Sequence, residues 1–353
     1  MSTTKIAVIA GDGIGPDLFN QTRKIIDILN RKFDNPIDYH IFPYSADYYL
    51  KTGISIPDEF IDDVSRIFDG ILLGPLGDPR IPEMKHAKEI IYKLRSRLNL
   101  RISIHPVKLF QNWLSILKDI ENKSVNYHII KEIYESTISH SEQIFNRDKE
   151  SAIVLQSNIL TLKNIRIFIQ QAFSYFQKAG LKNGCFVYPN PKFQQKLYYW
   201  NQAISEIKEK YPEIEITYKY PGTAIQDIML NPGEFDFFLT GSDIGDILTV
   251  ISSVTMGGCG LSYSIESNPD LISVYRIMQA SATKLVGSNT INPFGAFLTL
   301  YQILKDNDHR RESELLMDAL MTNFSNHWVT IDLGGIMGTE EVTDYICDYI
   351  RRN

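Results

Sequence analysis

The most regular hydrophobic pattern lies at the start of the chain. Residues Ile6 to Ala10 are apolar or small and predict a buried strand, and they lead into a turn with glycines at positions 11, 13 and 15. Pro16 suits the first turn of a helix, and residues 17–33 have the period of an amphipathic helix. A strand, a glycine turn and a helix are typical of an α/β domain with a ligand near the strand's carboxyl end, although such a turn can also be purely structural.

The same alternation continues along the chain. Further strands are expected at 71–74, 101–107, 185–188, 214–220 and 235–240, and helices at 88–98, 164–179, 193–210, from about 245, and at 293–305, 311–327 and 339–351. Residues 124–158 are expected to begin another lobe, with a polar, irregular stretch at 139–151. Strands that alternate with helices predict α/β layers.

Composition excludes several classes of protein. The chain has 353 residues, a net charge of −6 and no basic block, which argues against a nucleic-acid partner or an anionic membrane surface. No apolar run approaches the roughly 18 residues that span a bilayer. The first predicted strand begins within five residues, so we expect no signal peptide. Three scattered cysteines, Cys185, Cys259 and Cys347, suit a reducing compartment and no cysteine-based zinc site, so we expect a cytoplasmic protein.

Several spaced segments together resemble the β-decarboxylating dehydrogenases, the family of isocitrate and isopropylmalate dehydrogenases. The matching segments, in the family's order, are Gly11–Pro16, Leu94–Arg95, Pro106–Lys108, Asn231–Pro232, Phe235–Asp236, Gly245–Leu248, Asn292–Pro293 and Asp332–Gly335 with Thr339. A weaker likeness, in Gly77–Pro82 and His86, is to the tartrate/D-malate branch.

This resemblance implies an α/β, two-lobed fold with a central mixed sheet flanked by helices. One lobe would comprise residues 1–108 and 262–353, and the smaller lobe residues 109–261 with a dimerisation arm near 139–158. It implies a homodimer, or a hetero-oligomer with an active paralogue. Family members bind a 2-hydroxy acid on Mg²⁺ or Mn²⁺, transfer a hydride to NAD(P)⁺ and decarboxylate the product.

The resemblance assigns the metal to three aspartates, and this chain matches one of them. Asp246 stands at the first position, whereas the second falls on Val250 and the third on Gly222. A hard divalent cation needs several oxygen ligands, so Asp246 is the remnant of a metal site. Asp243 could replace a ligand, but it is more simply interpreted as the N-cap of the following helix.

The catalytic and substrate-binding positions are also altered. Of three arginines that the resemblance expects around the substrate carboxylates, Arg95 is present, and the other two positions hold His105 and Tyr134. The catalytic lysine position falls on Asn190, and Lys192, two residues later, is the candidate to replace it.

The catalytic tyrosine of the family falls near Ser141, beside His140, which could serve as an acid or be an ordinary loop histidine. On the cofactor side, Ala280 and Lys284 replace family residues, while Gly287 and Asn292 remain as candidate nucleotide contacts.

These losses favour a non-catalytic relative that binds a small carboxylate or a nucleotide, or regulates a paralogue. The alternative is an active NAD(P)-dependent oxidoreductase on a small 2-hydroxy acid such as malate, tartrate or isopropylmalate, with rearranged catalytic groups. The position of Lys192 relative to Asp246 discriminates between them.

Overall fold

The computed structural model describes residues 3–138, 140–188, 194–269 and 271–353. The first part of the chain forms β1 (Thr4–Ile9), α1 (Gly15–Lys32), β2 (Ile37–Phe42), α2 (Ala46–Thr52), α3 (Asp58–Ile67), β3 (Gly70–Leu73), α4 (Lys85–Arg97) and β4 (Ile102–Lys108).

The middle forms β5 (Asn126–Glu132), α5 (Glu135–Ile138), β6 (His140–Phe145), β7 (Ile153–Asn158), α6 (Leu162–Ala179), β8 (Asn183–Val187), α7 (Gln194–Lys208), β9 (Glu215–Lys219), α8 (Pro221–Leu230), β10 (Phe237–Thr240) and α9 (Ser242–Thr255). The last part forms β11 (Tyr263–Ser267), β12 (Ser273–Ile277), α10 (Phe294–Asp306), α11 (Arg310–Ser325) and α12 (Thr339–Arg352).

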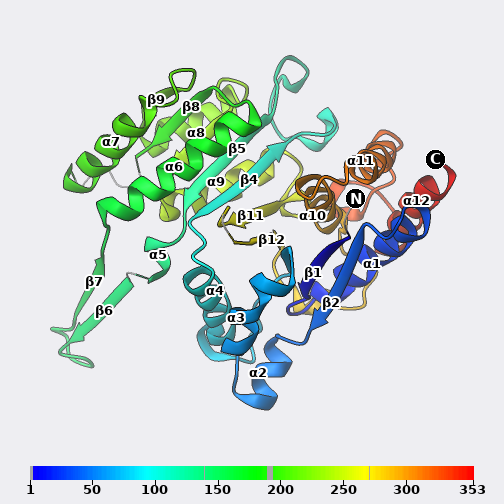
Figure 1. Ribbon diagram of the computed structural model, residues 1–353, viewed down its shortest axis with the longest axis horizontal. Helices are drawn as coiled ribbons and strands as arrows, with labels where there is room; N and C mark the ends of the chain where they lie inside the picture. Colours follow the sequence, from blue (N-terminus) through cyan, green and yellow to red (C-terminus); the bar gives the residue numbers. More distant parts are fainter. Residues whose placement is uncertain (1–2, 139, 189–193, 270) are drawn as a thin grey trace.

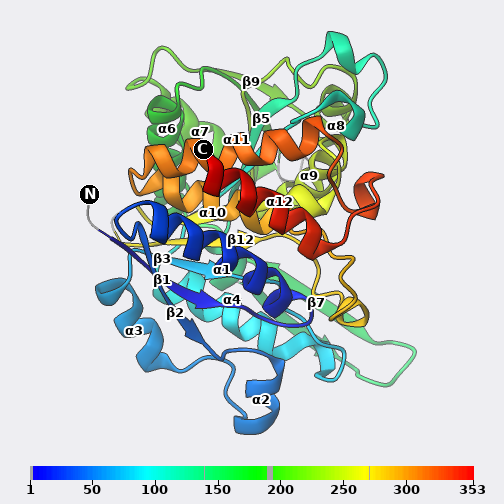
Figure 2. The same ribbon diagram turned by 90° about the vertical axis from the view of Figure 1, so that its right-hand side faces the viewer.

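A large mixed sheet forms the centre of the described chain. Its ten strands are ordered β2-β1-β3-β12-β11-β4-β5-β10-β8-β9, with antiparallel pairs β12–β11, β11–β4 and β4–β5 at its centre and parallel pairs on both sides. Helices flank the sheet, and α1, α10, α11 and α12 lie side by side, with α10 against β11 and β12 (Figure 2). The expected α/β fold with a central mixed sheet is therefore confirmed.

The boundaries of the two expected lobes meet inside this sheet, between β4 and β5. These two strands pair over seven positions, from Ile102 with Glu132 to Lys108 with Asn126. The division into lobes stays a prediction, and the strands of both segments share one sheet.

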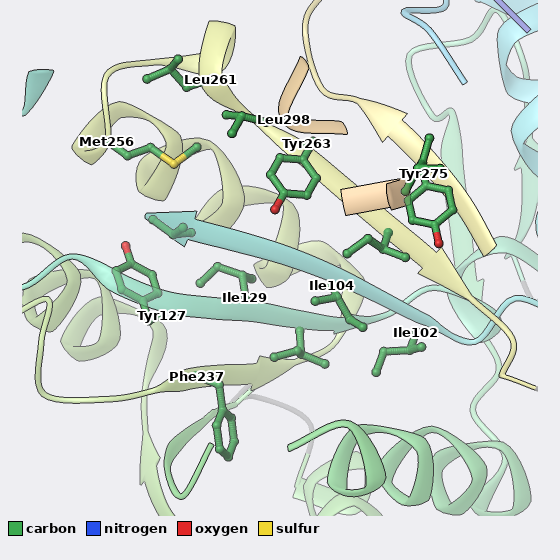
Figure 3. Packing of buried hydrophobic residues seen from close by; sticks show 14 of the residues in the cluster. Ile102, Ile104, Tyr127, Ile129, Phe237, Met256, Leu261, Tyr263, Tyr275 and Leu298 are labelled. Carbon is green, nitrogen blue, oxygen red and sulfur yellow. The ribbon is translucent and has the colours of Figure 1, made fainter. Parts of the chain in front are cut away.

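The largest core cluster crosses the same boundary. Ile104 and Tyr263 come from the strands of one segment, and Tyr127, Ile129 and Phe237 come from the other (Figure 3). Burying a large apolar side chain contributes about 1.5–3 kcal/mol, so contacts across this seam couple the two segments energetically.

The segment expected to hold an arm forms a separate two-stranded hairpin. Strands β6 and β7 pair antiparallel and extend away from the rest of the molecule (Figure 1). Ile144, Phe145, Ile153, Val154 and Leu155 are exposed on it. The role of this hairpin in dimerisation stays a prediction.

The glycine turn after β1 packs backbone against backbone. Gly11 has φ +78° and Gly13 has φ +54°. A Cβ at Gly11 would lie 2.1 Å from the carbonyl oxygen of Pro75, and one at Gly13 would lie 1.9 Å from that of Ser281. Glycine is needed here both for the left-handed backbone and for the close approach of two other loops.

Most expected elements agree with the structure to within a few residues. The sequence pattern missed β5, β11 and β12 at the centre of the sheet, as well as β2, β7, α2, α3, α5 and α8. The stretch 139–151, expected to be irregular, contains strand β6. The end of the β10–α9 turn also differs from expectation: α9 begins at Ser242 with Gly241 as its N-cap, so Asp243 lies in the first turn and is not the cap. Within the described ranges, none of the helices has the length and apolarity needed to cross a bilayer.

We expect Gly184→Ala to destabilise the fold by roughly 1–3 kcal/mol, because a Cβ there would lie 2.1 Å from the ring of Phe237. That ring is fully buried and stacked on Phe176, at 3.6 Å between ring centroids, so it has little freedom to move. Urea denaturation measures the change. Gly222→Ala is the control, because nothing lies within 4 Å of its added Cβ. Equal stability of both variants would contradict the packing argument.

Candidate functional site

Two groups of polar residues are joined by helix α4, and the first surrounds Asp12. The Asp12 carboxylate accepts hydrogen bonds from the main-chain N–H groups of Ala46 and Gly77, each at 2.6 Å. It also lies 2.7 Å from Nε2 of His86, and both side chains are buried. One carboxylate thus ties the glycine turn to α2, to the loop after β3 and to the start of α4.

Beside this turn the surface holds an open pocket of about 590 Å³. Its lining comes from Gly11, Asp12, Gly13, Pro16, Asp17, Ser45, Ala46, Asp47, Asp78, Pro79, Arg80, Thr283 and Val286. Arg80 crosses the pocket wall, with Nη2 at 2.7 Å from both Asp78 and Asp47. The volume of this pocket is in the range of cofactor and ligand sites.

The other end of α4 carries the second group. Arg95 binds Glu266 through two hydrogen bonds, of 2.9 Å from Nε and 2.7 Å from Nη2, and Arg276 reaches the same carboxylate at 2.5 Å. Burial alone would raise the pKa of the Glu266 carboxyl, but the two guanidinium groups outweigh burial and hold that pKa well below its usual range. Glu266 is therefore a buried anion that fixes both arginines.

Lys131, at the carboxyl end of β5, forms an ion pair with Asp246 of α9. The lysine side chain is 8% exposed and the aspartate 66%, so the pair joins the interior to the surface. Burial lowers the pKa of the Lys131 ammonium, and Asp246 opposes that effect. Gly245 allows this contact, because a Cβ there would lie 2.6 Å from Cβ of Lys131 and would push the helix away.

Strand register brings these groups together. Glu266 pairs with Ser103, and Ser103 with Lys131, so Glu266 and Lys131 lie in one row across β11, β4 and β5. His105 lies two positions from Ser103 and therefore on the same face. It is 1% exposed, and burial, with a smaller contribution from Lys131, lowers its pKa to about 3, so its ring is neutral.

Helix α4 sets the spacing between the pocket and the cationic group. Arg95 follows His86 by nine residues, which corresponds to roughly 13 Å along the helix axis at a rise of about 1.5 Å per residue. A ligand extending from the pocket toward Arg95 would therefore run along α4.

Other residues singled out by the sequence lie elsewhere or are bound within the protein. Tyr134 lies under the guanidinium of Arg101, whose carbon is 3.8 Å from the ring centroid. The side-chain amide of Asn292 donates to Asp332 at 2.9 Å and its oxygen accepts from the main chain of Phe294, so this residue supports α10. Gly287 donates its N–H to Asp17, a pocket residue.

The remaining candidates are only partly placed. Asn190 and Lys192 lie outside the described residues. His140 and Ser141 belong to strand β6 of the hairpin. The part of the chain that the structure describes therefore brings together Arg95, His105 and Asp246, and adds Lys131 to them.

The side chains around Asp246 do not fit a hard divalent cation. No group of three or more His, Cys, Asp or Glu side chains that could hold a metal occurs among the described residues. Val250 is 58% exposed and has no ligand atom, Gly222 has no side chain, and the oxygen of Asp246 binds an ammonium. Such a cation takes six or more oxygen ligands.

Comparison with known proteins identifies the class. The sequence profile described as isocitrate/isopropylmalate dehydrogenase matches residues 5–346. The chain belongs to the isocitrate/isopropylmalate dehydrogenase family.

Individual relatives match over nearly the whole chain. A 3-isopropylmalate dehydrogenase of Prochlorococcus marinus is 27% identical, with 97% of this chain and 96% of the relative covered. One from Aquifex aeolicus is 26% identical, with 100% and 98% covered. Among solved structures, an isocitrate dehydrogenase from Methylococcus capsulatus superposes with a TM-score of 0.86 at 21% identity, covering 99% of this chain and 100% of that one.

These relatives correct the expectation of a non-catalytic protein, which is wrong: proteins that match along almost the entire chain are named as dehydrogenases. Lys131, which sequence reasoning overlooked, brings a buried cation to Asp246. The sequence pattern gave no strand over residues 126–132, so no signal placed Lys131 in the site.

We expect Glu266→Gln to lower the free energy of unfolding by about 3–5 kcal/mol at neutral pH, because it leaves two largely buried guanidinium groups without their anion. A carboxyl with a lowered pKa contributes stability that is present above its unfolded pKa of about 4.3 and is lost as the pH falls below it. The difference between wild type and variant should therefore shrink on acidification. Urea denaturation from pH about 7 to about 3 measures both effects.

The matched control is Glu314→Gln, which removes an exposed pair with Arg310. We expect this change to cost less than about 1 kcal/mol. A Glu266→Gln variant as stable as the control would contradict the assigned role.

Proposed function

We propose that this protein is an NAD(P)-dependent oxidoreductase that acts on a small 2-hydroxy acid such as malate, tartrate or isopropylmalate, with catalytic groups rearranged relative to its family. The observation that carries the proposal is the placement of an open, polar pocket and a buried cationic group at the two ends of one helix, α4. The names of the relatives support the reaction class. The likeness of residues 77–82 to the tartrate/D-malate branch makes those acids the first to test.

The volume of the pocket, about 590 Å³, supports a site for a nucleotide cofactor. The lining carries the carboxylates of Asp12, Asp17, Asp47 and Asp78. Arg80 pairs with Asp47 and Asp78, and Asp12 accepts two main-chain N–H groups, so part of this negative charge is compensated within the protein. Thr283 and Val286 also line the pocket, and the candidate contact Gly287 follows them directly in the chain and donates its N–H to Asp17. When bound there, NAD(P)⁺ supplies the acceptor for a hydride from the carbinol carbon.

The cationic group would hold the substrate. Arg95 and Lys131 offer charged N–H donors to a carboxylate, and their aliphatic stems are fixed by burial. His105 stays neutral behind them. Lys192 remains our candidate for the group that takes the hydroxyl proton as the alcohol becomes a ketone.

An absorbance assay for reduced nicotinamide, with each cofactor and a panel of 2-hydroxy acids, tests the proposal. We expect turnover with at least one acid, and a loss of roughly 10²–10⁴-fold in kcat for Lys192→Met if that lysine is the base. Lys210→Met is the control, because Lys210 is exposed in the turn that follows α7. No reduction of either cofactor by any acid in the panel would refute the proposed reaction.

We also propose a homodimer, with a hetero-oligomer containing an active paralogue as the alternative. Ile247, Val250 and Val254 lie three to four residues apart on α9 and are all exposed, as are the apolar residues of the β6–β7 hairpin. Such a stripe along a helix is typical of a surface covered by another chain.

The double substitution Val250→Glu and Val254→Glu should give a monomer, because burying two carboxylates in an apolar interface is costly. Light scattering after size-exclusion chromatography measures the mass. Ile67→Glu, at an exposed apolar residue of α3, is the control and should leave the mass unchanged. A dimer that survives the double substitution would exclude this interface.

The three cysteines are free thiols, with Cys185 and Cys347 buried and Cys259 exposed. They support our proposal that the protein works in a reducing compartment, the cytoplasm.

A further inference from the structure

The carboxylate that the family resemblance assigns to a metal is occupied by part of the protein itself. The Lys131 ammonium donates to Oδ1 of Asp246. Lys131 belongs to β5, and α9 packs over its side chain. Gly245 of α9 allows the helix backbone to lie close to the Cβ, Cγ and Cδ atoms of Lys131. A divalent cation on the same oxygen would meet a fixed positive charge at contact distance.

The surrounding charges are organised around cations of the protein. Glu266 neutralises one of the two guanidinium groups that contact it, Arg95 and Arg276, and Asp246 neutralises Lys131. Glu132, the next acidic side chain within electrostatic reach of Arg95, accepts the N–H groups of Tyr134 and Glu135. Glu266 and Asp246 thus bind cations of the protein and Glu132 binds main-chain N–H groups, and among the described residues these carboxylates form no group that could hold a metal.

We propose that the Lys131 ammonium takes the place of the divalent metal on Asp246, so that this protein binds the carboxylate of a small hydroxy acid without a metal ion. The inference rests on the proposed function for the class of ligand. Asp246 holds the ammonium toward the surface, where the aspartate is 66% exposed, and the remaining N–H donors of Lys131 are available to a bound anion.

Arg95 completes the arrangement on the other side of the row. Its Nε and Nη2 hold Glu266, while Nη1 lies 3.4 Å from the hydroxyl of Thr137 and is the donor that faces away from the carboxylate. A carboxylate placed between Nη1 of Arg95 and Nζ of Lys131 would receive charge-assisted hydrogen bonds from two cations that the fold already holds in position.

Isothermal titration calorimetry with D-malate and tartrate on the full chain tests this proposal. We expect at least one acid to bind, with a dissociation constant that agrees to within about twofold between excess EDTA and added Mn²⁺. Lys131→Met should weaken that binding roughly ten- to hundredfold, because it removes a charged donor. Lys131→Arg should restore most of it, which a purely structural role of the lysine would not require.

Lys219→Met is the matched control. Lys219 is another largely buried lysine, paired with Asp227 and Glu234 near the far edge of the sheet, so its loss should affect stability without affecting acid binding. Each variant is first compared with wild type by thermal unfolding and circular dichroism. If Lys131→Met does not fold, Lys131→Arg and the effect of EDTA on wild type still decide the question.

Mn²⁺ binding followed by electron paramagnetic resonance gives a second readout that needs no turnover. We expect the wild-type chain to leave the signal of free Mn²⁺ undiminished. Stoichiometric Mn²⁺ binding that Asp246→Asn removes would overturn the proposal. So would acid binding that EDTA abolishes, acid binding that is unchanged in Lys131→Met, or no binding of either acid.

The two proposals fail in different ways. Acid binding in EDTA without reduction of a cofactor would support the ammonium site and refute the dehydrogenase reaction. Turnover that requires Mn²⁺ would support the reaction and refute the ammonium site.

Discussion

Helix α4 is fixed at both ends by buried carboxylates, and the geometry of the candidate site depends on this constraint. Asp12 holds His86 at the first turn, and Glu266 holds Arg95 near the last. An α-helix is stiff over this length, so two anchors define the direction and the separation of everything attached to it. The pocket at the glycine turn and the cationic group on the central strands are therefore parts of one rigid arrangement, although their residues come from distant segments.

The same constraint explains why so many charges are buried in one region. A buried ion pair adds little net stability compared with apolar packing, but breaking one is costly because it leaves an uncompensated charge. Glu266 with its two arginines, and Asp246 with Lys131, thus specify one arrangement of α4, β11, β5 and α9. In this chain the cation beside Asp246 is the Lys131 ammonium, supplied by strand β5. The packing of α9 on β5 therefore places the Lys131 ammonium beside Asp246.

The glycine turn and the strands of the sheet show which elements the local sequence pattern can predict. Gly11 and Gly13 adopt left-handed backbone and admit the loops of Pro75 and Ser281, as a turn between a buried strand and a helix suggests. The apolar runs correctly predicted strands β1, β3, β4, β8, β9 and β10 and most of the longer helices, but missed the edge strand β2. The central strands β5, β11 and β12 escaped because they carry charged and hydroxyl residues, such as Lys131, Glu266 and Arg276, at positions that face the site. Functional residues there interrupt the hydrophobic period that identifies a strand.

The sequence by itself determined the α/β class, the family and the position of Asp246, because spaced motifs and hydrophobic period are properties of the linear chain. It could not determine what stands beside Asp246. That depends on strand register, which pairs Ser103 with both Lys131 and Glu266, and on the approach of α9 that Gly245 permits. Contacts between residues more than a hundred positions apart are fixed only when the strands pair and the helix packs. The tertiary structure alone therefore decided that an ammonium lies where the motif suggested a metal.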